Sequence, residues 1–194
     1  ANNISKFMGI FNGTSNFILS KMTHEQTTFK DALEEAQRLG FAEADPTDDV
    51  EGVDAARKVV ITSYLSFNQV IKLNDVKSVG ISDITLADIN AASALNYKIK
   101  LIGKGTYENG YVNASVEPTL IHKNHQLAAV ENEYNAIYVI GDAVGDTMFY
   151  GKGAGSLATG SAVVSDLLNV ALFFESNLHT LPPHFELKTE ETKE

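Results

Sequence analysis

The spacing of apolar residues changes once along this chain of 194 residues, and that change limits the folds open to it. Before residue 96, apolar residues mostly recur at the three- and four-residue intervals of helices, as in FKDALEEAQRLG at 29–40. After it, YKIKLIGKGTY and YVNASVEPTLI alternate apolar with polar residues on either side of Glu108-Asn109-Gly110, a strong hairpin signal. Helices gathered early and antiparallel strands gathered late predict an α+β fold, with a mainly antiparallel or mixed sheet and helices packed on one face.

Turn and capping residues divide the first half of the chain into elements. ISKFMGIF at 4–11 is rich in β-branched and aromatic residues and predicts a strand. We expect Thr14 to cap the next helix, and Thr28 and Gly40 to begin and end the one after it. The other expected elements are a helix from Val50 to Phe67, capped by Thr47 or Asp48 and burying Val50, Val53, Val60, Ile61, Tyr64 and Leu65, a strand at 70–73, and a helix capped by Ser82 or Asp83.

Net charge and cysteine content exclude several classes of protein. The chain has 25 acidic and 15 basic side chains and no cysteine. Its formal charge of −10 repels nucleic-acid phosphates and anionic membranes, so neither is an expected partner. No apolar run reaches eighteen residues and no export leader opens the chain, so we expect a cytoplasmic location. Disulfides and thiolate chemistry are excluded.

An acidic run ahead of a lysine is the main chemical signal. Six carboxylates precede Lys58, namely Glu43, Asp45, Asp48, Asp49, Glu51 and Asp54. The simplest interpretation is a solvated surface, with Asp54 and Lys58 forming an ion pair one helical turn apart. Alternatively, loop carboxylates converge on the lysine and hold a substrate ammonium group while the lysine transfers a proton. A divalent-cation site and a hydrolase pair of Glu43 with Asp49 are two further alternatives.

Three segments, GIFNGTSNFILSKM, LGFAEADPTDDVEGVDAARK and GKGAGSLATGSAVVSDLL, together resemble the catalytic portion of homoserine dehydrogenases. They occur in the family's order between about residues 9 and 170. The resemblance implies interconversion of L-homoserine and L-aspartate 4-semialdehyde with NADP or NAD, in the aspartate pathway that supplies threonine and methionine. It also implies a small-molecule substrate, and it implies no metal ligand among the residues of these segments.

The resemblance also assigns roles to residues. Lys58 is similar to the family's proton-transfer lysine, and Asp54 would position that lysine and the substrate. Glu43 resembles the substrate-binding glutamate, and Asp49 is implied as a neighbouring substrate contact. The expected substrate-binding set is completed by Gly13 and Thr14 of the NGT segment and by the backbone of Phe41, which replaces a tyrosine of some members.

The expected cofactor contacts are Gly153 and Gly155, in the glycine run that approaches the cofactor in the family. Family members have a nucleotide-binding domain ahead of the NGT segment, so we expect this chain alone to bind nucleotide poorly and to be almost inactive. The resemblance divides the chain into a substrate-binding catalytic region (1–125), dimerisation strands (126–150), a glycine run with a helix that returns to the nucleotide-binding domain (151–178), and a tail (179–194). It implies a homodimer, paired through 135–150. The rival hypothesis is a non-catalytic, regulatory module that binds an amino acid.

Overall fold

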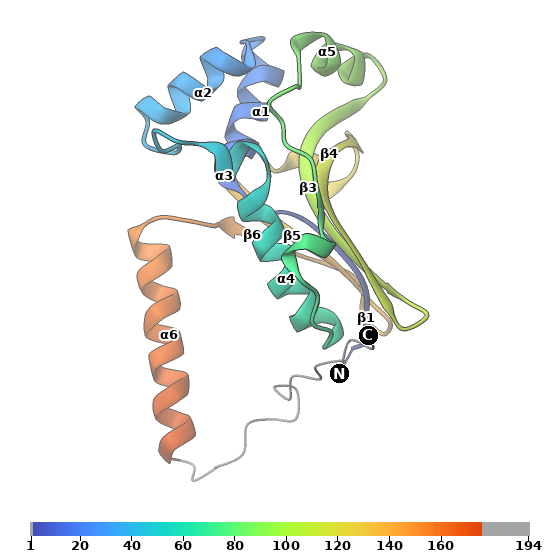
Figure 1. Ribbon diagram of the computed structural model, residues 1–194, viewed down its shortest axis with the longest axis vertical. Coiled ribbons are helices and arrows are strands. Elements are labelled where there is room, and N and C mark those ends of the chain that lie inside the picture. The colour runs from blue at the N-terminus through green and yellow to red at the C-terminus, as the bar shows by residue number, and fades with distance from the viewer. Residues whose placement is uncertain (1, 176–194) are drawn as a thin grey trace. The chain divides into compact units, whose positions relative to one another are not determined.

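The computed structural model describes residues 2–175, and the chain divides into two compact units after Gly153. The expected tail lies outside the described residues. The first unit contains a six-stranded sheet with the strand order β2-β4-β3-β1-β5-β6 (Figure 1). All neighbouring strands are antiparallel except β2 and β4, which are parallel. The predicted α+β fold with a mixed sheet is therefore confirmed. The strands are β1 (Ile4–Ile10), β2 (Lys77–Ser78), β3 (Tyr97–Glu108), β4 (Tyr111–His122), β5 (Tyr134–Gly141) and β6 (Gly145–Lys152).

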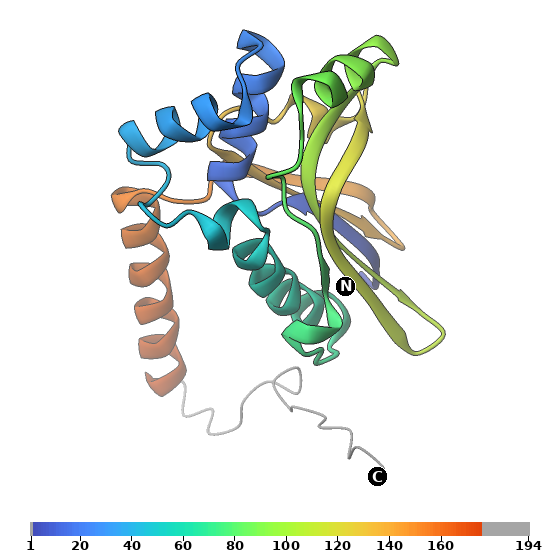
Figure 2. The same cartoon turned by 45° about the horizontal axis from the view of Figure 1, so that its top comes forward.

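Helices cover one face of the sheet, as Figures 1 and 2 show. They are α1 (Gly13–Glu25), α2 (Phe29–Arg38), α3 (Thr47–Val50), α4 (Val53–Phe67) and α5 (Leu86–Ala94). The main core lies between these helices and the sheet, and α4 packs directly on β1, β3 and β4. Glycines in β3 make this packing possible: a Cβ at Gly103 would lie 2.5 Å from Val59 Cγ2, and one at Gly105 would lie 2.4 Å from Phe7 Cε1.

The second face of the sheet has a smaller apolar cluster. It is covered at one end by the short 3₁₀ helix η2 (Gln126–Ala129), which contributes Leu127 and Ala128. Ile10, Ile102 and Ala136 belong to the same cluster. Side chains of β1 thus alternate between two apolar layers, and this strand lies in the middle of the sheet.

The predicted hairpin around Asn109-Gly110 is present, and a second hairpin follows it along the chain. Tyr97–Glu108 and Tyr111–His122 pair along their whole length, and both turn residues between them, Asn109 and Gly110, have positive φ angles of 52° and 86°. Such angles are typical of a type I′ turn, which matches the right-handed twist of the strands. The second hairpin pairs β5 with β6.

Three local expectations are wrong, two of them because a side chain near the predicted end makes a better cap. Asn12, not Thr14, caps α1, and its side chain accepts a hydrogen bond from the Ser15 amide. Thr85, not Ser82 or Asp83, caps α5 and forms a capping box with Asp88. The segment 70–73 is not a strand, and a 3₁₀ turn, η1 (Leu73–Asp75), begins at its last residue.

The prediction of one long helix from Val50 to Phe67 is also wrong in two respects, its continuity and its buried face. Gly52 has a φ of +77° and separates α3 from α4, and Pro46 precedes α3 without a side-chain cap. The buried face of α4 is formed by Ala55, Ala56, Val59, Ser63 and Phe67. Ile61 and Leu65, which we expected in the core, are 59% and 71% exposed. Small residues occupy the buried face because the helix approaches the sheet closely.

A buried lysine on β3 links helix α1 to the segment that precedes β5. The Lys100 ammonium on β3 donates to Asn16 Oδ1 (3.0 Å), to the Val130 carbonyl (2.6 Å) and to Glu131 Oε2 (3.3 Å). The Asn16 amide in turn donates to the carbonyls of Val130, Asn132 and Tyr134. Helix α1, strand β3 and the segment before β5 are thereby tied by hydrogen bonds to one another.

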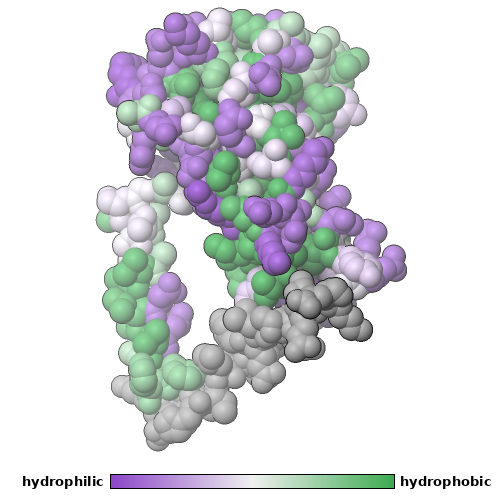
Figure 3. Space-filling model, viewed as in Figure 1, coloured by the Kyte–Doolittle hydropathy of each residue, from purple (hydrophilic) through white to green (hydrophobic). Residues whose placement is uncertain are grey.

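The second unit contains the predicted last helix, α6 (Ser156–Glu175). Its apolar side chains are exposed, with Leu157 at 89%, Leu167 at 64% and Phe174 at 74%. Apolar residues cover much of the α6 surface visible in Figure 3. By length and composition alone, Ser156–Phe174 meets the criteria for a membrane-spanning helix, although a helix that packs on protein can meet the same criteria.

Candidate active site

The lysine singled out in the sequence lies at the end of β1, where several elements meet. Lys58 on α4 donates from Nζ to Asp54 Oδ2 at 2.7 Å and to the Phe11 carbonyl at 3.0 Å. The side chains of Lys58 and Asp54 are 43% and 29% exposed, so the pair is accessible from solvent. The expected pair, one helical turn apart, is therefore present, and the backbone carbonyl of Phe11, just after β1, fixes the lysine from a second side.

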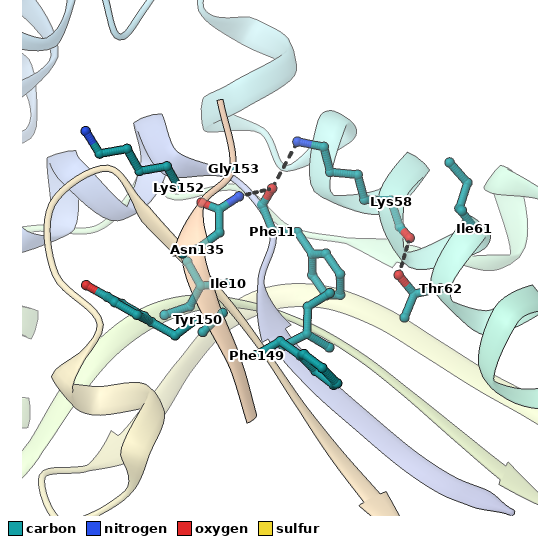
Figure 4. Close-up of a pocket in the computed structure, with 13 residues that line it drawn as sticks. Ile10, Phe11, Lys58, Ile61, Thr62, Asn135, Phe149, Tyr150, Lys152 and Gly153 are labelled. Atoms are coloured by element: carbon teal, nitrogen blue, oxygen red, sulfur yellow. Dashed lines mark hydrogen bonds between the residues drawn. The ribbon is translucent and has the colours of Figure 1, made fainter. Parts of the chain in front are cut away.

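Two asparagines complete this network. The Asn12 amide donates to Asp49 Oδ1 at 2.6 Å and to Asp54 Oδ2 at 3.1 Å. The Asn135 amide on β5 donates to the Phe11 carbonyl at 3.2 Å, so this oxygen accepts hydrogen bonds from both Lys58 and Asn135 (Figure 4). The segment between β1 and α1 is thereby linked to side chains of α3, α4 and β5 in a continuous chain of hydrogen bonds.

The break at Gly52 brings the two carboxylates together. Asp49 is on α3 and Asp54 is on α4, and the left-handed backbone at Gly52 redirects the chain between them. An uninterrupted helix would place residues five positions apart about 140° apart around its axis, on different faces. Gly52 is also tightly surrounded, since an added Cβ would lie 3.0 Å from Val116 Cγ1.

The NGT segment packs against the loop that precedes α3. The Thr14 hydroxyl donates to the Phe41 carbonyl at 2.7 Å, and Thr14 is buried. The ring of Phe41 rests against Phe17, with 4.9 Å between ring centroids, and remains 38% exposed. A Cβ at Gly13 would lie 2.6 Å from the Glu133 carbonyl oxygen, so glycine permits the close approach of two backbones here.

The remaining carboxylates of the acidic run do not join the lysine. Asp45 accepts hydrogen bonds from the backbone and side chain of Thr47, which hold the Asp45 pKa below its usual value. Asp48 and Glu51 also have partners other than Lys58. Asp48 pairs with Arg57, and Glu51 accepts a hydrogen bond from the Ser82 hydroxyl.

Glu43 is exposed, and its backbone carbonyl accepts a hydrogen bond from Gln37 at 3.0 Å. Within residues 2–175, no group of three His, Asp or Glu side chains is arranged to hold a metal ion. The carboxylates that the structure brings to Lys58 are therefore Asp49 and Asp54, and Glu43 and Asp45 lie outside this hydrogen-bond network.

A cavity of about 390 Å³ lies beside Lys58, between α4 and strands β1, β5 and β6. Its walls are mostly apolar, including Ile137 and Phe149, and the lysines at 58 and 152 contribute to its lining (Figure 4). Gly153 also lines it, and a Cβ at this position would lie 2.0 Å from the Asn135 amide nitrogen. Gly155 lies in the second unit and is not part of this lining.

Sequence reasoning did not identify Asn135 or Lys152. Asn135 and Ile137 are two residues apart on β5, so their side chains point to the same face of the sheet, the one that carries the helices. That pattern alone does not reveal that β5 pairs with β1, which is the contact that brings Asn135 to the Phe11 carbonyl.

Comparison with known proteins supports the resemblance of the sequence segments. The family model for homoserine dehydrogenase matches residues 1–168. A homoserine dehydrogenase from Bacillus subtilis is 55% identical over 167 residues, which are 86% of this chain and 39% of that protein. One from Pseudomonas aeruginosa is 46% identical over 184 residues, covering 95% of this chain and 42% of that protein.

Solved structures agree with these relatives. A homoserine dehydrogenase from S. aureus is 87% identical, with a TM-score of 0.88 over 97% of this chain and 46% of that chain. A hyperthermophilic archaeal homoserine dehydrogenase, solved in complex with NADPH, is 29% identical, with a TM-score of 0.73 over 88% of this chain and 48% of that chain. The chain therefore spans less than half the length of these relatives, and it belongs to the homoserine dehydrogenase family.

Proposed function

We propose that this chain is the substrate-binding and catalytic portion of an enzyme that interconverts L-homoserine and L-aspartate 4-semialdehyde with a nicotinamide cofactor. The observation that carries the proposal is the accessible Lys58 ammonium, held by Asp54 and the Phe11 carbonyl at the edge of a cavity. Family membership supplies the reaction class, and the geometry of the site supports a role for this lysine in it.

Lys58 transfers the proton in this proposal. An ammonium group has three N–H donors, and the contacts described for Lys58 use two of them. In the reducing direction, the third donates to the aldehyde oxygen and protonates it as hydride reaches the carbon. In the oxidising direction, the neutral amine accepts the hydroxyl proton of homoserine as hydride leaves the same carbon.

Carboxylates near Lys58 suit the ammonium group that both substrates carry. Asn12 holds Asp49 next to Asp54, and the proposal assigns Asp49 to this ammonium group, together with Glu43 from the preceding loop. Gly13 and Thr14 would bind the substrate carboxylate, since they belong to the first turn of α1, where backbone amides suit an anion. Phe41 contributes its backbone, which already holds the Thr14 hydroxyl.

The cavity beside Lys58 fits the nicotinamide end of the cofactor. Apolar walls at Ile137 and Phe149 suit a flat ring, and Gly153 lets the backbone come close to it. When bound, NADP or NAD supplies the hydride acceptor or donor. We assign the rest of the cofactor to a nucleotide-binding domain outside this chain, because relatives are more than twice as long and the chain has no Rossmann fingerprint. The cofactor contact at Gly155 stays a prediction.

The decisive experiment replaces Lys58 in the complete enzyme that contains this chain. We expect Lys58→Ala to lower kcat for homoserine oxidation by at least about 100-fold, the usual contribution of a positioned acid or base. Lys30→Ala is the matched control, because Lys30 is 83% exposed and its only described ion pair, with Glu34, is a long one at 3.9 Å. Full activity of Lys58→Ala would remove Lys58 from the mechanism. Homoserine binding without oxidation by the unsubstituted protein would favour the regulatory module.

We also propose that the complete enzyme is a cytoplasmic homodimer that pairs through residues 135–150. In support, β6 is an edge strand and exposes Phe149 and Tyr150 to 66% and 57%. Unpaired edges and exposed aromatic side chains are typical of association surfaces. Light scattering of the complete enzyme at high concentration should give twice the mass of one chain, and a monomer would contradict the proposal.

A further inference from the structure

Every polar atom of the Asn12 side chain has a partner. Its Oδ1 accepts a hydrogen bond from the Ser15 amide at 2.8 Å and so caps α1. Its Nδ2 donates to Asp49 Oδ1 and Asp54 Oδ2. A side-chain amide has one acceptor oxygen and two N–H donors, so this set of contacts uses the whole group. Asn12 is 5% exposed, so no solvent-facing role remains for it.

Few side chains other than an amide make these three contacts. Asp and Ser are N-caps about as good as Asn, so capping alone does not require an amide here. Asp offers no donor when ionised, and Ser offers one donor on a shorter side chain. The two N–H groups therefore serve the carboxylates, which would otherwise repel each other without a donor between them.

The second contact leads directly to the reactive group. Asp54 Oδ2, which accepts from Asn12 at 3.1 Å, is the same oxygen that accepts from Lys58 Nζ at 2.7 Å. Asn12 thus fixes the rotamer of the carboxylate that orients the lysine. It also fixes Asp49 on α3 relative to α4, across the break at Gly52.

We propose that Asn12 is a positioning residue for the reaction. Its amide holds the carboxylates of Asp49 and Asp54 at a fixed separation, and this sets the direction from which Lys58 reaches the substrate oxygen. Asn12 acts through these side chains and does not itself contact the substrate. This inference rests on the proposed function, since it assigns Asn12 a part in the proton transfer by Lys58.

Asn12→Asp in the complete enzyme separates positioning from capping. The substitution keeps the shape and the cap but replaces two donors with a carboxylate that faces Asp49, Asp54 and the Lys58 ammonium. At neutral pH we expect kcat to fall by about 10- to 100-fold, the usual effect of a small displacement of a catalytic group. As the pH falls, the new carboxyl group takes up a proton and donates to one neighbour, so the ratio of variant kcat to unsubstituted kcat should rise.

Two further variants complete the test. Asn12→Ser retains a capping oxygen but has no second donor. We expect its kcat to fall, and the ratio of its kcat to the unsubstituted kcat should not rise at low pH. Asn109→Asp is the matched control, because it makes the same charge change in the exposed turn between β3 and β4, where kcat should be unaffected. Thermal unfolding followed by circular dichroism checks that each variant is folded.

The outcomes of the two proposals are distinct. Asn12→Asp with unsubstituted kcat at every pH, alongside an inactive Lys58→Ala, would leave the proposed function intact and overturn the role of Asn12. The same kcat ratio for Asn12→Asp and Asn12→Ser at every pH would also overturn it, because the donor that Asn12→Asp regains on protonation would then have no effect on the reaction. Homoserine oxidation that survives Lys58→Ala would remove Lys58 from the mechanism, and the positioning role of Asn12 with it. Absence of homoserine oxidation in the unsubstituted complete enzyme would overturn the proposed function.

Discussion

Two lysines in this fold differ in surroundings and therefore in what they do. Lys58 is 43% exposed and keeps a donor for a substrate, whereas Lys100 is buried and its described contacts are three protein oxygens. Burial lowers the pKa of Lys100 to about 8, against the attraction of Glu131. Burial acts in the opposite direction on Glu131, but the charge of Lys100 and a hydrogen bond from Lys98 outweigh it and lower the Glu131 pKa to about 2.

The low pKa of Glu131 predicts how stability responds to acid. Between its ordinary value of 4.5 and its value of about 2, the unfolded state binds more protons than the folded state. Stability from this group is therefore present above pH 4.5 and is lost as the pH falls towards 2, by on the order of 3 kcal/mol. Urea unfolding at a series of pH values should show a shallower acid slope for Glu131→Gln than for the unsubstituted chain.

Glu34→Gln is the control for this measurement, since Glu34 is 64% exposed and forms only a long ion pair with Lys30. Its acid slope should equal that of the unsubstituted chain. An unchanged slope in Glu131→Gln would mean that the buried pair does not contribute to acid stability. Neither Lys100 nor Glu131 stood out in the sequence, because their pairing depends on a contact between β3 and the segment before β5.

At the scale of elements, the break between α3 and α4 is the feature on which the site depends. Gly52 and Gly40 have nearly the same φ, +77° and +78°, but only Gly52 is surrounded by other atoms. We expect Gly40→Ala to cost about 1–2 kcal/mol from backbone strain alone. Gly52→Ala should cost more, because its Cβ also meets Val116, and it should lower kcat by displacing Asp49 from Asp54. Chemical denaturation and steady-state kinetics of the complete enzyme measure both effects, and equal costs with unchanged kcat would contradict this prediction.

Sequence patterns predicted the elements better than their packing. The hairpin at Asn109-Gly110 and the cap at Thr28 depend on neighbouring residues only, and both are present. The buried face of α4 depends on distant residues, since Gly103 on β3 lets the helix approach until alanines fit where larger residues were expected. The pair of Asp54 and Lys58 was predictable from helical spacing, whereas Asn135 reaches the site through the pairing of β1 with β5.

At the scale of the whole molecule, the exposed apolar surface of α6 predicts the behaviour of this chain in isolation. Exposed leucines and valines along a helix bind hydrophobic dyes and promote association. We expect the 194-residue chain to increase the fluorescence of such a dye, and the double variant Leu167→Gln, Leu168→Gln to do so less. The control is Leu120→Gln, near the end of β4, where Leu120 is 52% exposed. This variant should leave the fluorescence nearly unchanged. Equal fluorescence from all three would exclude α6 as the source.

Strand β1 is synthesised before its partners, and yet it lies in the middle of the sheet. Phe7 pairs with Gly105 on one side and with Val139 on the other. The ribosome must therefore release most of the first unit before β1 has either neighbour, and pairing between such distant segments is slow. The hairpin of β3 and β4 forms through a local turn, so it can form quickly and pair with β1 once both of its strands have left the ribosome. We therefore expect assembly during translation to begin with the β3–β4 hairpin, to continue with β1, and to end with β5 and β6.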